Sequence, residues 1–203
     1  MTYGDLVGAS NEELRNLQVW QRSVRLENRT ALRRRQKLAK SGALDNLRVS
    51  DALFRDQRDL LSLLEISTDE EVDRMADCAT PLFRLRLRCT DFKLDAFTGR
   101  SVDPIEAEGI EESFLALAAR LDAVRTDLEQ ARIVFGLTKA EALWLSRYCP
   151  HELYALARDP SMALQQVAHW DYFVACATRS LSREQRSLLS AVSRRSPATM
   201  PAV

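Results

Sequence analysis

The chain opens with a long amphipathic segment. From Asn11 to about Lys40 it contains no Pro or Gly, and Ser10 with Glu13 matches a capping box at the start. Its apolar residues return every seven positions, at Leu17, Val24, Ala31 and Leu38. This pattern predicts one helix whose apolar stripe packs on another helix, either across a bundle or in a dimer partner.

Apolar periods typical of helices continue along the chain. They predict helices over about 44–64, 114–131 and 162–178, and one opened by Ser182-x-x-Gln185 that ends near Val192. Between them, Thr98 to Glu112 contains two Gly, one Pro and five acids. That composition is typical of a linker with only short helical turns.

Two segments of the chain match each other without a gap at a separation of 71 residues. Ile66-Ser67-x-x-Glu70 aligns with Leu137-Thr138-x-x-Glu141, and Cys78 aligns with Cys149. In each copy the Ser or Thr caps a helix that ends near the Cys, and Pro81 or Pro150 then starts the next helix. The repeat predicts two related helix-turn-helix-like pairs, with both cysteines packed at close helix crossings.

The segment that follows the first pair has a different pattern. Residues 83–89 alternate apolar and basic side chains, and Phe92, Leu94 and Phe97 nearly extend the alternation. A short strand or β-hairpin near 83–97 accounts for this alternation, and the alternative keeps residues 83–87 helical.

These patterns predict an all-α fold, a helical bundle with two related helix pairs and a long N-terminal helix. The expected divisions are a first unit over 1–98, an acidic linker over 99–113, a second unit over 114–195 and a frayed tail over 196–203. No apolar run is long enough for a membrane span, and residues 1–10 lack the features of a secretory signal, so a cytoplasmic protein is expected.

The sequence lacks the motifs that are typical of enzymes and of metal-binding proteins. The cysteines at 78, 89, 149 and 176 and the histidines at 151 and 169 do not have zinc spacing, so no metal or cofactor is expected. Phosphate-loop, dinucleotide-binding and hydrolase-elbow motifs are absent from the sequence. We therefore expect a protein that works by binding.

Charge is distributed unevenly although the formal net charge is zero. Residues 1–40 hold nine basic and four acidic groups, residues 174–203 hold five and one, and only four of the 29 basic residues are Lys. Because the guanidinium fork suits phosphate and carboxylate alike, these ends can contact nucleic acid, the chain's own acidic centre or a partner's acidic face.

One segment resembles a known family. The run from Phe135-Gly136-Leu137-Thr138 to Leu153-Tyr154-Ala155-Leu156-Ala157 is similar to the helix-turn-helix half of the FlhD flagellar transcriptional activators. Residues 64–85 resemble the same segment, with Glu65 in place of its Gly. The resemblance implies an all-α, dimer-forming regulator of flagellar or secretion genes that acts with a second subunit on promoter DNA.

A regulator of this kind needs a cationic face and an oligomer interface. The first copy has the more cationic face, so DNA contacts are expected at Arg74, Thr80, Arg84, Arg86 and Arg88. The N-terminal helix is expected to form a dimer interface through Leu17, Trp20, Val24 and Leu38. The alternative is a non-enzymatic helical adaptor or accessory protein of a motility or type III secretion system, which binds protein partners.

Overall fold

The computed structural model describes residues 11–42, 57–87, 89 and 102–193, and it confirms the all-α expectation. In chain order the helices are α1 (Asn11–Lys40), α4 (Arg58–Ile66), α5 (Asp69–Ala76), α6 (Pro104–Thr126), α7 (Leu128–Phe135), α8 (Lys139–Leu145), α9 (Leu153–Ala157), α10 (Trp170–Thr178) and α11 (Arg183–Val192). Two strands, β1 (Phe83–Leu85) and β2 (Leu164–Gln166), pair antiparallel in the described part of the chain.

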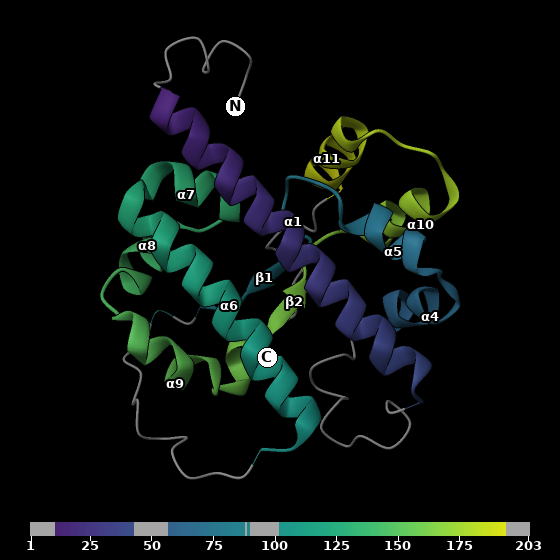
Figure 1. Ribbon diagram of the computed structural model, residues 1–203, viewed down its shortest axis with the longest axis horizontal. Coiled ribbons are helices and arrows are strands. Elements are labelled where there is room, and N and C mark those ends of the chain that lie inside the picture. Colours follow the sequence, from purple (N-terminus) through teal and green to yellow (C-terminus); the bar gives the residue numbers. More distant parts are fainter. Residues whose placement is uncertain (1–10, 43–56, 88, 90–101, 194–203) are drawn as a thin grey trace.

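Helix α1 divides the described structure into two groups of helices. It crosses the molecule diagonally, with α6, α7, α8 and α9 on one side and α4, α5, α10 and α11 on the other (Figure 1). The β1–β2 ribbon lies between the two groups (Figure 1). Both groups therefore pack against one central helix.

The predicted N-terminal helix is confirmed over Asn11–Lys40. Its apolar stripe packs inside the chain: Trp20 and Val24 belong to the main core, and Leu38 packs with Ala39 and Leu61. Leu17 is partly buried against the main core. The sequence left open whether this stripe packs across a helical bundle or against a dimer partner. Packing within the bundle accounts for the observed burial.

The main core is continuous across the predicted linker. It joins Val24 of α1 and Phe83 of β1 to Leu121 of α6 and Phe173 of α10. The expected short turns are wrong from Pro104 to Glu112, because α6 begins at Pro104 with the Asp103 side chain accepting from the Glu106 N–H at 2.8 Å. Residues 98–101 of the predicted linker lie outside the described residues. Asp-Pro is a helix-start signal, and it outweighs the Gly and Pro content of the segment.

The capping boxes show where the two copies diverge. Thr138 caps α8 with Glu141, as predicted. In the first copy the cap is Thr68 with Glu71, so the prediction of Ser67 with Glu70 is wrong by one residue. Ser67 is instead buried, and its hydroxyl donates to the Leu63 carbonyl at 2.7 Å.

The elements after the two capped helices differ more strongly. Pro150 starts a short 3₁₀ turn that leads into α9, as predicted. Pro81 starts no helix, because β1 follows it and pairs Leu85 with Leu164 of β2. The first copy is therefore not a helix-turn-helix pair, and the alternating pattern at 83–85 correctly indicated a strand.

The pairing of β1 with β2 also changes the later part of the chain. The helix predicted over 162–178 begins only at Trp170, where the His169 side chain accepts from the Asp171 N–H. Cys149 is exposed, so its expected packing role is wrong, whereas Cys78 is fully buried. The predicted extension of the strand or hairpin over 90–97 lies outside the described residues.

Arg35 of α1 connects distant parts of the fold. Its guanidinium donates to the Glu112 carboxylate of α6, the Gln57 side chain and the Leu164 carbonyl of β2, each at 2.8–2.9 Å. It also lies 4.2 Å from the ring centroid of Phe83. Burial lowers the pKa of Arg35, and the Glu112 charge opposes that shift.

A second buried arginine joins the same two helices. Arg120 of α6 is fully buried and donates to both carboxylate oxygens of Glu27 on α1, at 2.5 and 2.8 Å. Its guanidinium also lies 5.0 Å from the ring centroid of Phe135. The α1–α6 contact is therefore held by charge pairs as well as by apolar packing.

Replacing Glu112 by Ala should destabilise the protein by about 3–5 kcal/mol, because the buried guanidinium of Arg35 loses its counter-charge. Urea unfolding followed by circular dichroism measures the loss. The control is Glu108→Ala, which removes an exposed pair with Lys37 and should change stability by about 1 kcal/mol or less. Equal losses in the two variants would contradict a central role for the Arg35 pair.

The cap of α5 predicts a pH dependence. Hydrogen bonds from the Thr68 N–H and hydroxyl lower the pKa of Glu71. A carboxyl group whose pKa is lower when folded stabilises the protein above its unfolded value of about 4.3, and that contribution is lost as pH falls through the folded pKa.

The stability difference between the wild type and Glu71→Gln should therefore be constant near neutral pH and change on acidification in the direction unfavourable to the wild type. Urea titrations at a series of pH values measure it. Glu70→Gln is the control, since the Glu70 side chain takes no part in this cap. A stronger acid dependence from Glu70 than from Glu71 would support the cap that the sequence pattern indicated.

Candidate functional site

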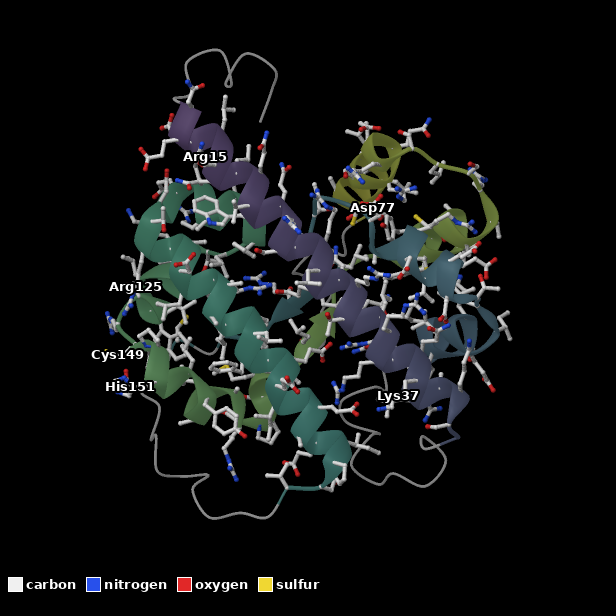
Figure 2. All side chains as sticks on the ribbon, in the orientation of Figure 1. Arg15, Lys37, Asp77, Arg125, Cys149 and His151 are labelled. Atoms are coloured by element: carbon white, nitrogen blue, oxygen red, sulfur yellow. The ribbon has the colours of Figure 1, made fainter. Side chains whose placement is uncertain are left out.

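The solvent-facing side of α1 carries a row of basic and apolar side chains. We call six of these positions the outer seam: Arg15, Val19, Arg22, Leu26, Arg29 and Arg33. Intervals of four and three residues place them on one face of the helix. Arg15 and Lys37 mark the two ends of this region of α1 (Figure 2), and the seam contains no acidic residue.

A groove of about 690 Å³ lies beside the outer seam. We call it the arginine groove, and it is lined by Arg22, Arg25, Leu26, Arg29, Glu70, Asp73, Arg74, Ala76, Asp77 and Arg186. Five guanidinium groups thus face three carboxylates. The lining has an excess of positive charge although the chain as a whole is neutral.

Asp77 is the most heavily used carboxylate of the groove. It accepts from Arg186 at 2.6 Å and from Arg183 at 2.9 Å, both on α11. The Nε of Arg186 also donates to the Asp77 carbonyl at 2.9 Å. These contacts attach α11 beside the end of α5, and in Figure 2 Asp77 lies between α1 and α11.

Three of the groove's arginines have no close carboxylate. Arg22 has no ion pair among the described residues, and Arg25 approaches Asp77 only to 4.0 Å. Arg74 lies 3.9 Å from Glu71, whose carboxylate already accepts from the Thr68 cap. These three guanidinium groups therefore keep donors for an external anionic group.

The remaining arginine of α1 in the groove is compensated internally. Arg29 forms a two-pronged contact with Asp73, at 2.9 Å from Nε and 2.6 Å from Nη2. Arg33, further along the outer seam, also pairs with Asp73. The available positive charge is therefore concentrated at Arg22, Arg25 and Arg74.

A smaller groove of about 500 Å³ lies on the other side of α1, against α6. There Arg34 pairs with Glu112 at 2.8 Å and Lys37 pairs with Glu108 at 2.6 Å. The Arg34 guanidinium lies so close to Gly109 that an added Cβ would stand 2.8 Å from its Nη2. Arg29 and Arg33 also line this groove and pair with Asp69 and Asp73 of α5. Because its cations are paired by carboxylates of α5 and α6, this groove is the weaker candidate for binding an anion.

Among the described residues predicted to contact DNA, Arg74 alone lines the arginine groove. Thr80 shares a hydrogen bond with the Ser190 hydroxyl, and Arg84 pairs with the largely buried carboxylate of Glu141 at 2.5 Å. Arg86 is half-buried just after β1, and Arg88 lies outside the described residues. The described members of this set do not form one cationic helix face.

Three of the four residues predicted as a dimer interface lie in the interior, and Leu17 is partly buried. Trp20, Val24 and Leu38 are each less than 5% exposed within the single chain. Their burial against α4, α6 and the neighbouring elements accounts for the apolar stripe without a second subunit.

Sequence reasoning missed Arg22, Arg25 and Leu26. Helical spacing could have identified the outer seam, since positions 15, 19, 22, 26, 29 and 33 share one face of the predicted helix. The pairing state of each arginine could not be read in this way, because the carboxylates that pair with these arginines come from α5 and from Asp77, which follows it.

Comparisons with protein-family models, with curated proteins and with solved structures found no match. Among the described residues, no helix combines the length and apolar character needed to cross a membrane. The same residues contain no cluster of three or more side chains suited to holding a metal ion.

Asp77→Asn should loosen α11, because the largely buried guanidinium of Arg186 loses its ionic partner. We expect amide hydrogens of residues 183–192 to exchange about tenfold faster or more, as for a charged hydrogen bond of about 1.5–3 kcal/mol. Asp122→Asn, an exposed change on α6, is the matched control. Unchanged exchange in α11 would show that Asp77 does not hold this helix.

Proposed function

We propose that this protein is a non-enzymatic adaptor that binds an acidic segment of a partner protein in the arginine groove. The observation that supports this most directly is the combination of three underpaired arginines with an exposed apolar side chain. Arg22, Arg25 and Arg74 line the groove together with Leu26, which is 65% exposed. Arginine forks beside an apolar contact are typical of protein interfaces.

The mixed charge of the groove favours a protein partner over DNA. Glu70 and Asp73 lie in the same lining, where they would repel a continuous row of phosphates. A protein partner can place carboxylates opposite the arginines and neutral or basic groups opposite the acids. Leu26 is also better matched by an apolar side chain than by a phosphate backbone.

The promoter-binding regulator remains the competing proposal. Arginine forks bind phosphate as well as carboxylate, so Arg22, Arg25 and Arg74 would be its contacts too. The predicted cationic helix face of the first copy does not support it, since β1 takes the place of the second helix. A relationship to the flagellar activators, a role in motility and a second regulatory subunit stay predictions.

The test replaces Arg22, Arg25 and Arg74 together by Ala and measures binding to a labelled Glu-rich peptide and to a DNA duplex by fluorescence anisotropy. We expect the wild type to bind the peptide, and the triple variant to bind it at least about tenfold more weakly. The fold should be retained, because these three side chains have no close ion pair.

The matched control removes the same charge elsewhere, through Lys139, Arg147 and Arg179 changed to Ala, which do not line the groove. It should leave peptide binding unchanged. Tighter binding to DNA than to the peptide, with a loss of about 40-fold or more between about 50 and 200 mM salt as for three phosphate contacts, would favour the promoter-binding regulator. Equal weakening by both triple variants would contradict a specific site.

A further inference from the structure

The outer seam has the spacing of a helix-pairing surface. Its intervals of four, three, four, three and four residues are those of the core positions of a coiled coil. In that frame Val19 and Leu26 occupy one repeated position, and Arg15 and Arg22 occupy the other. The heptad thus alternates apolar and cationic contacts from Arg15 to Arg29, along about 21 Å of α1, and Arg33 occupies the third position of the apolar series.

The exposure of these side chains leaves the seam open in the single chain. Val19 is 54% exposed and Leu26 is 65% exposed, and neither belongs to the apolar cores. Arg15 and Arg22 are exposed and have no ion pair among the described residues. The opposite face of α1, through Val24, Ala31 and Leu32, is buried in the main core.

We propose that the acidic partner segment is an amphipathic α-helix that packs lengthwise along the outer seam. Its apolar side chains lie against Val19 and Leu26, and its carboxylates lie against Arg15 and Arg22. This inference rests on the proposed function, since it names the form of the segment that the arginine groove binds. Arg25 and Arg74 flank the helix from the groove side.

Charge disfavours a second copy of the same seam as the occupant. Every charged residue from Arg15 to Arg33 on the seam is basic, so two parallel copies would place guanidinium groups opposite one another. Two antiparallel copies would place Arg22 and Arg29 against Leu26 and Val19, with no carboxylate to pair them. Like charges at facing positions oppose association, whereas carboxylates at those positions favour it. A helix of complementary charge is therefore the occupant that the seam selects.

Repeat length favours a helix over an extended segment. Contacts of one kind recur along the seam every seven residues, or about 10 Å. A helical partner with a heptad repeat matches that distance without interruption. An extended segment could gain backbone hydrogen bonds only from a strand edge, and neither β1 nor β2 lines the groove.

The experiment compares two labelled peptides of about three heptads with identical composition. In the heptad peptide, Leu and Glu alternate at the core positions, and in the scrambled peptide the same residues have no repeat. Fluorescence anisotropy measures binding to the full chain, and circular dichroism measures the helicity gained in the mixture. We expect the heptad peptide to bind at least about tenfold more tightly and to gain helicity.

Two variants of the chain test the individual contacts. Leu26→Ser should weaken binding of the heptad peptide about fivefold or more, and Leu143→Ser, an exposed change on α8, should not. Arg22→Glu should weaken it about tenfold, and a peptide with Arg at the facing Glu position should restore binding. Circular dichroism of each variant alone confirms its fold.

The outcomes separate the two proposals. If both peptides bind equally, and both more weakly to the Arg22, Arg25 and Arg74 triple variant, the groove binds acidic segments but the helical occupant is overturned. If neither peptide binds, the proposed function and this inference both fail. If Leu26→Ser and Leu143→Ser have the same effect, the outer seam is not the surface that the helix contacts.

Discussion

The rest of the structure depends on the hydrogen bonds and the ion pair that the buried guanidinium of Arg35 forms. A charge that is 1% exposed is tolerated only where its donors are satisfied, and here Glu112, Gln57 and the Leu164 carbonyl satisfy them. These partners bring α6, the start of α4 and the β1–β2 ribbon to the same stretch of α1. A displacement of any one of them leaves a buried donor unpaired, so the contact specifies one arrangement of the two helix groups.

Helix α1 uses arginine in two different ways on its two sides. Arg35 points into the protein and is neutralised by Glu112, while Arg22 on the outer face has no carboxylate partner among the described residues. The amino-acid composition does not distinguish these two arginines, yet Arg35 stabilises the fold and Arg22 is available to a ligand. The basic character of the first 40 residues is therefore partly structural, and only its outer part supports the proposed binding of an acidic segment.

The corrections share one physical origin, which is competition between local signals and distant partners. Ser67 has the sequence of a cap, but its burial beside Leu63 leaves that role to Thr68, whose side chain faces the first turn of α5. Pro81 has the sequence of a helix start, but Phe83 and Leu85 gain burial and backbone hydrogen bonds by pairing with β2. The strand pairing spans about 80 residues of sequence, so no local pattern could reveal it.

The sequence by itself determined the helical class, the full extent of α1 and the capping boxes of α8 and α11, because these depend on residues within a few positions of one another. It also contained the spacing of the outer seam. Only the tertiary structure decided which arginines are neutralised, since the carboxylates of Asp73, Asp77 and Glu112 reach α1 from other elements. Charge pairing acts through space, so the arginines available in the arginine groove are those that no close carboxylate of the fold neutralises.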